Sequence, residues 1–260
     1  MKRERSGQLM RDFWDAKALE NAMYYVSSYR GYDQRSPEEF WQWGRTLAER
    51  FLRESGIRFT GEESVLEIGC GIGRMTAYFA ERFRQVSAVD VSPRMIEQAR
   101  SNLDRYSNVS LLVCNGYDLN DFEDARFDFV FSYITFQHIP DAAITARYIG
   151  EAGRVLRDGG HFYFQVNNLP QGVRERLRVR SRLRALLGRV GDSEEAPSFG
   201  LSRGPTDLEN PAWRGSRVSV ERLKRACRRG YLEILGMEGE GTQYLWVKAA
   251  RKARGDRGVS

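Results

Sequence analysis

One stretch near residue 70 constrains the fold of this chain more than any other part of it. Residues 65–68 are mostly apolar and include β-branched side chains, which is typical of a buried strand. Gly69, Gly71 and Gly73 follow at alternate positions, and a helical pattern comes after them. Glycine lets the backbone turn tightly and lets a ligand approach the main chain, because no Cβ intervenes. A strand, a glycine turn and a helix start form the first half of a nucleotide-binding βα unit, so the sequence predicts an α/β fold.

The spacing of the glycines bears on the kind of ligand. The dinucleotide-binding pattern G-x-G-x-x-G needs its third glycine where this chain has Arg74. Here Gly73 comes one residue early, and Glu67 stands two residues before the first glycine. An acidic side chain at that place would repel a pyrophosphate and could pair with a cationic ligand. The sequence therefore favours a cationic ligand over a dinucleotide.

The stretch from residue 67 to residue 73 resembles motif I, E/D-x-G-x-G-x-G, of the class I S-adenosylmethionine-dependent methyltransferases. The resemblance implies a doubly wound, mostly parallel seven-stranded sheet of Rossmann-like type that ends in an antiparallel hairpin. It also implies S-adenosyl-L-methionine as cofactor and S-adenosyl-L-homocysteine as product. That cofactor carries a sulfonium and an ammonium but no phosphate, which suits an acid before the glycines. The residues expected to bind it in this stretch are Glu67, Gly69, Gly71, Gly73 and Arg74.

A second acidic residue follows at the end of the next predicted strand, 86–90. Asp90 lies about twenty residues beyond the glycine turn, where nucleotide-binding units place an acid that accepts the two ribose hydroxyls. Ser92 then begins a helix as its cap, with a proline at the first helical position. The segment resembles the family's D-x-S-x-x-M pattern, in which the residues matched here by Val91 and Met95 flank the adenine.

The third predicted strand, 109–113, leads to Asn115 and Gly116. The family usually has aspartate at the position of Asn115, where it binds the adenine amino group. Asparagine keeps one acceptor and gains a donor. The resemblance therefore still implies that Asn115 and Gly116 contact the adenine.

The fourth predicted strand, 127–133, leads into residues 134–140, which resemble the family segment ending in (L/F)-Q-H-I-P. Ligands of a doubly wound sheet bind at the carboxyl ends of its strands, so Tyr133 and His138 are expected near the transferred methyl group. A hydroxyl acceptor must lose its proton, and His138 is the candidate base. The alternative is that His138 only packs or orients a loop.

The predicted helix 142–156 ends at a glycine pair, and the fifth strand is expected at 161–166. Residues 151–160, E-A-G-R-V-L-R-D-G-G, resemble the family's stretch before that strand. A helix capped by Ser219 and two strands, 231–237 and 242–249, complete the predicted core.

The first sixty residues read as helical and rich in aromatic side chains. Ser36 and Pro37 mark a helix start, and Gly56 marks its end. We expect a lid over the cofactor cleft, lined by Tyr24, Tyr25 and Trp41. The alternative is that these rings pack the helices onto the sheet.

An arginine-rich segment, Arg174–Arg189, lies in a predicted insertion before the last two strands. It fits a solvated helix face, a site for an anionic substrate, or a surface for membrane or nucleic acid. The predicted organisation is a helical lid at 1–60, a Rossmann-like core at 61–168 and 218–250, an inserted lid or substrate segment at 169–217, and a disordered tail at 251–260.

Composition narrows the class further. At 260 residues and 41% hydrophobic content, the chain can build one core of ordinary size. No apolar run approaches the ~20 residues of a membrane span, and residues 1–11 lack the apolar core of a signal peptide. The 3 cysteines show neither disulfide nor metal spacing. We therefore expect a cytoplasmic protein with reduced thiols and no metal site.

The resemblance implies methyl transfer from S-adenosylmethionine by in-line displacement at carbon. We expect a small-molecule acceptor, with an anionic one among the options, methylated on oxygen or nitrogen by a monomer or homodimer. The motif N/D-P-P-Y/F is absent at 132–135, which argues against nucleic-acid bases as acceptors. Two alternatives stay open: an RNA or protein methyltransferase that docks through Arg174–Arg189, and a non-catalytic regulator that binds S-adenosylmethionine.

Overall fold

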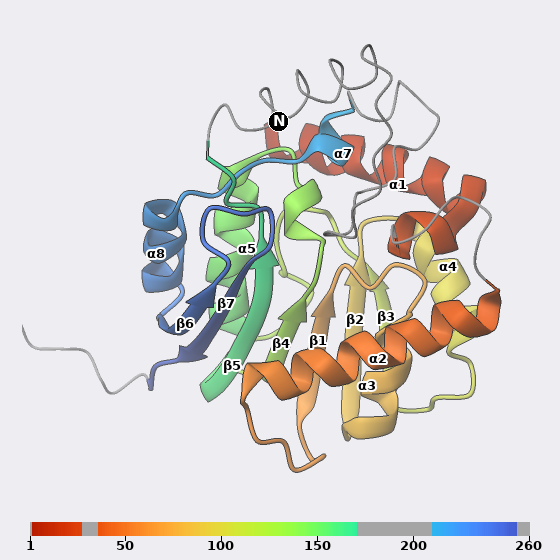
Figure 1. Ribbon diagram of the computed structural model, residues 1–260, viewed down its shortest axis with the longest axis horizontal. Helices are drawn as coiled ribbons and strands as arrows, with labels where there is room; N and C mark the ends of the chain where they lie inside the picture. Colours follow the sequence, from red (N-terminus) through yellow and green to blue (C-terminus); the bar gives the residue numbers. More distant parts are fainter. Residues whose placement is uncertain (1, 28–35, 171–209, 254–260) are drawn as a thin grey trace, which may run out of the picture.

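The computed structural model describes residues 2–27, 36–170 and 210–253. Their centre is a seven-stranded sheet with the order β3-β2-β1-β4-β5-β7-β6 (Figure 1). The strands β1 to β5 pair with one another in parallel, and β7 is antiparallel to both β5 and β6. The predicted fold, a doubly wound sheet with an antiparallel terminal hairpin, is confirmed. The strands are β1 Ser64–Ile68, β2 Gln85–Asp90, β3 Val109–Val113, β4 Phe127–Ser132, β5 Leu156–Val166, β6 Leu232–Glu238 and β7 Leu245–Arg251.

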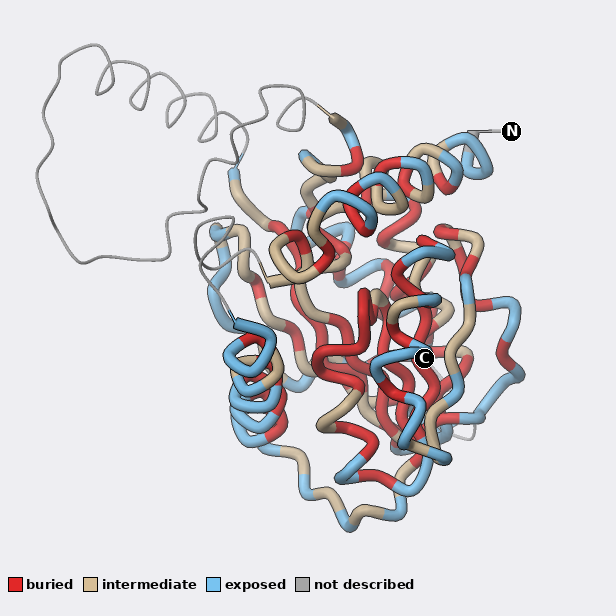
Figure 2. The backbone as a smooth tube through the Cα atoms, turned by 90° about the vertical axis from the view of Figure 1, so that its right-hand side faces the viewer, coloured by how far each residue is buried: buried red, intermediate tan, exposed pale blue. Residues whose placement is uncertain are grey.

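Helices cover both faces of the sheet, and α1 lies above the carboxyl ends of its parallel strands (Figure 1). One face packs on α2 and α3, and the other packs on α5 and α8. The buried residues concentrate in the strands and on the inward sides of the helices (Figure 2). The helices are α1 Lys2–Ser27, α2 Pro37–Ser55, α3 Thr76–Arg82, α4 Pro93–Asn102, the short 3-10 helix η1 Phe136–His138, α5 Ala142–Val155, α7 Pro211–Arg214 and α8 Val220–Arg229.

The second N-terminal helix, α2, has the predicted ends but belongs to the core layer. Ser36 and Glu39 form a capping box, and Gly56 ends the helix in a left-handed conformation with φ of 63°. Its Phe51 packs against Phe131 of the sheet, with ring centroids 6.0 Å apart. Of the predicted helical lid, α1 is therefore the part that covers the strand ends.

The helix α1 bends at Asn21, whose backbone is extended, with φ of −168° and ψ of 84°. The Asn21 side chain accepts a hydrogen bond of 3.0 Å from the main-chain N–H of Tyr24, as a helix cap does. The bend redirects the last turn of α1, which carries Tyr25 and Val26, toward the glycine turn.

The fifth strand begins at Leu156, earlier than the prediction of 161–166. Leu156 pairs in parallel register with Phe127 of β4. The Arg157 guanidinium also donates to both carboxylate oxygens of Asp128, at 2.8 Å each. These contacts pair the start of β5 with β4. The glycine pair at 159–160 lies within the strand at an irregularity, where the register shifts between Phe127 and Phe129 and Gly159 has a φ of 76°.

Candidate functional site

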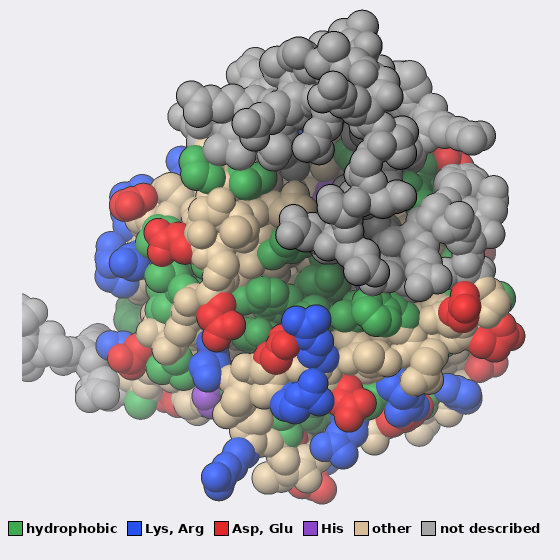
Figure 3. All heavy atoms as spheres, viewed as in Figure 1, with side chains coloured by type: hydrophobic (Ala, Val, Ile, Leu, Met, Phe, Trp, Pro, Cys, Tyr) green, Lys and Arg blue, Asp and Glu red, His purple; other side chains and the backbone are tan. Residues whose placement is uncertain are grey.

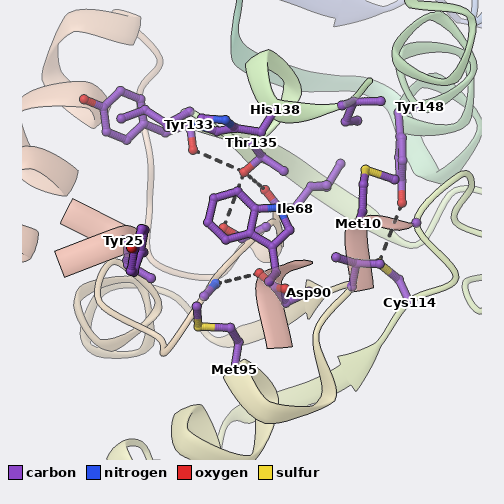
Figure 4. A pocket seen from close by; sticks show the side chains of 18 residues that line it. Met10, Tyr25, Ile68, Asp90, Met95, Cys114, Tyr133, Thr135, His138 and Tyr148 are labelled. Atoms are coloured by element: carbon purple, nitrogen blue, oxygen red, sulfur yellow. Dashed lines mark hydrogen bonds between the residues drawn. The ribbon is translucent and has the colours of Figure 1, made fainter. Parts of the chain in front are cut away.

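A cavity lies between α1 and the carboxyl ends of β1, β2 and β4 (Figure 4). The strand ends supply a carboxylate, glycine main chain and a histidine, while α1 supplies apolar and aromatic side chains. Predicted site residues and unpredicted ones meet in its wall. The lining residues are Met10, Trp14, Tyr25, Val26, Ile68, Gly69, Gly71, Asp90, Val91, Met95, Cys114, Gly116, Tyr133, Ile134, Thr135, His138, Ile139 and Tyr148.

Two of the three motif glycines bring main chain to the cavity. A Cβ added at Gly69 would lie 2.0 Å from the Thr135 hydroxyl, and one added at Gly71 would lie 2.7 Å from a methyl group of Val26. Both glycines also have positive φ values, of 81° and 55°, that favour glycine. The glycine turn is therefore a cradle whose main chain faces the cavity.

Gly73 does not line the cavity. Its φ is 89°, and an added Cβ would lie 2.6 Å from the side chain of Leu103. The third motif glycine thus lets the turn pack against the end of α4. Its predicted contact with the cofactor stays a prediction, because Gly73 does not face the cavity.

The carboxylate of Asp90 lies in the wall and faces the glycine turn (Figure 4). It accepts hydrogen bonds of 2.9 Å from the main-chain N–H groups of Gly71 and Ser92. Burial raises the pKa of Asp90, and these main-chain donors oppose the rise. Since a carboxylate has about four acceptor positions, it can still accept two ribose hydroxyls.

Glu67 and Arg74 line a smaller cavity that adjoins the first, since the two share Val26, Gly69, Tyr133 and Ile134. The Glu67 carboxylate accepts a hydrogen bond of 2.6 Å from the hydroxyl of Thr76. Burial raises the pKa of Glu67 to about 7, although the Thr76 bond and the Arg74 charge oppose the rise. An acidic and a basic side chain thus lie beside the glycine turn, where they suit the ammonium and the carboxylate of an amino-acid ligand.

Of the residues predicted to contact the adenine, Val91, Met95 and Gly116 line the cavity, but Asn115 does not. The Asn115 amide oxygen accepts from the main-chain N–H groups of Tyr117 and Asp118, at 2.9 and 3.0 Å. Its nitrogen donates to the Asp118 carboxylate at 2.6 Å. The Asn115 side chain thus stabilises the loop 115–118 through these hydrogen bonds, and its predicted contact with adenine stays a prediction.

Both predicted catalytic residues lie in the wall. The Tyr133 ring stacks on Trp246, with centroids 5.5 Å apart and 10° between the planes. Burial raises the pKa of Tyr133, which keeps its phenol protonated. The His138 Nδ1 lies 2.8 Å from the carbonyl oxygen of Trp213, and its Nε2 lies 3.3 Å from Nε2 of Gln137.

Aromatic side chains from distant parts of the chain form the roof beside His138. Trp14 of α1 and Trp213 of α7 lie 5.3 and 5.1 Å from the His138 ring, centroid to centroid. Tyr25 contacts Trp213 edge to face at 5.9 Å. Tyr24 instead packs on Tyr25, and Trp41 packs on Phe40. Of the three aromatic residues predicted for the cleft, only Tyr25 lines it.

Some lining residues carry no sequence signal that separates them from core residues. Met10 and Trp14 are four residues apart, which is the ordinary spacing of any helix face that packs. Trp213, which packs on the lining residues Trp14 and His138, lies in the predicted insertion 169–217, where nothing in the sequence indicates its partners. Their positions depend on how α1 and α7 dock on the sheet.

The arginine-rich segment 174–189 falls outside the residues that the structure describes. Among the described residues, no cluster of histidine, cysteine and acidic side chains could hold a metal ion, and no helix could cross a membrane. Charges of both signs are interspersed over the face in Figure 3, so its described part has no patch of a single sign.

The central part of the chain is similar to known methyltransferases. Residues 66–164 match the model of a family described as a methyltransferase domain. Over 101 residues the chain is 33% identical to a demethylmenaquinone methyltransferase of Tropheryma whipplei, covering 39% of this chain and 40% of the relative. Over 117 residues it is 34% identical to a sarcosine/dimethylglycine N-methyltransferase of Halorhodospira halochloris, covering 42% of this chain and 40% of the relative. The chain thus matches less than half of the length of these curated relatives.

Solved structures extend the likeness in fold. The chain superposes on phosphoethanolamine N-methyltransferase 1 of Haemonchus contortus, solved with phosphoethanolamine and S-adenosylhomocysteine, with a TM-score of 0.63. The two are 17% identical, and the alignment covers 100% of this chain and 52% of that one. At this identity the likeness shows a shared fold.

Proposed function

We propose that this chain, whose residues 66–164 match a methyltransferase domain, is a class I S-adenosylmethionine-dependent methyltransferase that transfers a methyl group to an oxygen or nitrogen of a small-molecule acceptor. The product of the donor is S-adenosylhomocysteine. The single observation that carries the proposal is that two adjoining cavities share the main chain of Gly69, with Glu67 in the wall of the smaller cavity and Asp90 in the wall of the larger one.

The residues present fit this donor. Gly69 and Gly71 line the cavity and carry no Cβ, so their main chain can approach the ligand there. Asp90 would accept the ribose hydroxyls, and Val91 and Met95 would flank the adenine. Glu67, once ionised, would pair with the ammonium. When bound, the donor supplies a methyl group already activated on its sulfonium.

The chain's own contribution is alignment and the exclusion of water. The roof formed by Trp14, Tyr25 and Trp213 covers the side of the cavity where His138 lies. Holding two reactants in line under such a roof replaces a bimolecular encounter by an oriented one. His138 would accept the proton of a hydroxyl acceptor at its Nε2.

A small molecule is the acceptor that best fits the observations. The relatives named above are described by small-molecule acceptors, and the wall near His138 is aromatic. We also propose a reducing, cytoplasmic setting, which the three free and buried cysteines support. Oligomeric state and contact of the arginine-rich segment with a membrane stay predictions.

The proposal is tested first on the donor. The purified chain is examined by mass spectrometry for a co-purified ligand and by thermal unfolding with added S-adenosylmethionine or S-adenosylhomocysteine. Binding to the folded state raises the melting temperature by mass action. A rise followed by turnover of phenols, amines or acids from an acceptor panel supports the proposal. Absence of both a bound ligand and a thermal shift contradicts it.

A further inference from the structure

A chain of buried amide side chains connects His138 to the hairpin between β6 and β7. Gln165, near the end of β5, and Gln137 of η1 are both buried, at 0% and 6% exposure. The Gln165 amide reaches Gln137, and Gln137 reaches His138. We call Gln165, Gln137 and His138 the amide relay.

One end of the relay fixes the orientation of Gln165. The main-chain N–H of Ile134 can only donate, and it lies 3.1 Å from Oε1 of Gln165. The carbonyl oxygen of Gln243 can only accept, and it receives a short hydrogen bond from Nε2 of Gln165. The oxygen and nitrogen of this amide are therefore set by two backbone groups of opposite character.

The orientation of the Gln165 amide fixes that of Gln137, which in turn faces His138. The Gln165 nitrogen also donates to Oε1 of Gln137 at 3.4 Å, which leaves Nε2 of Gln137 facing the histidine. That nitrogen is a donor, so Nε2 of His138 must accept from it at 3.3 Å. This end of the relay requires His138 Nε2 to be unprotonated.

The other end of the relay gives the same answer independently. The Nδ1 atom of His138 lies 2.8 Å from the carbonyl oxygen of Trp213, which can only accept. Nδ1 must therefore carry the proton. The main chain holds this contact, because Gly215 packs so closely on η1 that an added Cβ would lie 1.6 Å from the Gln137 carbonyl oxygen.

We infer that Gln137 and Gln165 are positioning residues that hold His138 as the neutral tautomer with Nδ1 protonated and a lone pair on Nε2. The catalytic meaning of this inference rests on the proposed function, since that lone pair is the one that would take the acceptor's proton. An acceptor hydroxyl would replace the long contact with Gln137. The tautomer itself is a property of the folded chain.

The test reads the protonation of each ring nitrogen by ¹H–¹⁵N NMR of the full chain. The sequence has 2 histidines, so His161→Gln assigns the signals of His138. In the parent chain at neutral pH, we expect a protonated Nδ1 and an unprotonated Nε2. A dominant Nε2–H tautomer, or an even mixture of the two, overturns the inference.

Gln137→Glu reverses the polarity at nearly constant shape. The carboxylate accepts where the amide donated, so both nitrogens of His138 become protonated and turnover falls at least tenfold. Gln137→Met removes the donor, and the two tautomers then mix. Gln42→Glu, on the exposed face of α2, is the matched control and leaves the His138 signals unchanged.

An unchanged His138 spectrum in Gln137→Glu, with the fold intact by circular dichroism, overturns the inference. The spectrum does not depend on methyl transfer. If the expected spectra appear but no acceptor is turned over, the proposed function fails and the tautomer assignment stands.

Discussion

The carboxylate of Asp90 accepts a 2.9 Å hydrogen bond from the main-chain N–H of Gly71. This bond ties the second acid of the site to the glycine turn that begins it, across the sheet from β2 to β1. The group that would bind the ribose thus also holds the cradle in shape. Loss of the Asp90 carboxylate therefore affects the ligand and the turn together.

We predict that Asp90→Ala weakens S-adenosylmethionine binding at least about tenfold, because hydrogen bonds to a charged group contribute about 1.5–3 kcal/mol each. Isothermal titration calorimetry measures the change. Asp104→Ala, at an exposed position, is the control and keeps the parent affinity. Equal affinity in Asp90→Ala would refute the placement of the ribose.

His138→Ala is expected to slow turnover at least tenfold while cofactor affinity stays within a few-fold, since the imidazole acts on the acceptor. His161→Ala, on β5, is the matched loss of a histidine and keeps the parent rate. Steady-state rates and calorimetry separate the two effects. Unchanged turnover in His138→Ala would remove it from the mechanism.

The raised pKa of Glu67 predicts a pH dependence of stability. Its pKa is 4.5 in the reference state and about 7 in the folded chain, so folding favours the protonated form. The favourable contribution is complete below pH 4.5 and is lost as the pH rises through 7. At about 1.4 kcal/mol per pH unit, the loss amounts to about 3 kcal/mol.

Glu67→Gln should remove this dependence, because the glutamine stays neutral and its oxygen can still accept from Thr76. Urea unfolding at pH 5 and pH 8 measures it: the variant gains stability relative to the parent chain at pH 8. Glu123→Gln, at an exposed position, serves as control. Parallel pH profiles for Glu67→Gln and the parent would show that Glu67 is ionised throughout.

Ile134 has a φ of 62°, which is rare for a β-branched residue, and it lines both cavities. We predict that Ile134→Gly is more stable than Ile134→Ala by about 1–2 kcal/mol, because both lose the side chain and only glycine escapes the left-handed strain. Urea unfolding compares the pair. At Gln42, within helix α2, Gln42→Ala should be more stable than Gln42→Gly, because glycine is the poorer helix former. The same order at both positions would contradict strain at Ile134.

Periodicity and cap residues predicted most of the fold. The cap at Ser92, the helix ends at Ser36 and Gly56, and the strand at 109–113 lie where the sequence indicates. Local signals suffice there, because each depends on residues within a few positions. The match of residues 66–164 to a methyltransferase domain agrees with the resemblance in motif I, and a solved methyltransferase shares the fold.

Contacts between distant segments could not be predicted. The start of β5 at Leu156 depends on pairing with Phe127 and on the contacts of Arg157 with Asp128 of β4, so the glycine pair forms an irregularity inside a strand. Asn115 turns away because Asp118 and Tyr117 use its amide. Trp41 does not line the cavity, because it packs on Phe40 in a small cluster that includes Ala18 and Ala22 of α1.

The docking of α1 has a consequence for biosynthesis. The Arg11 side chain bonds the carbonyl oxygens of Val91 and Cys114, which follow it by 80 and 103 positions, and Phe13 packs on Trp213. A ribosome makes α1 long before these partners, and contacts of long sequence separation form slowly because loop closure costs entropy. The parallel strands can therefore begin to pair before α1 docks on them. A nascent chain gains the complete aromatic roof beside His138 only after Trp213 has emerged.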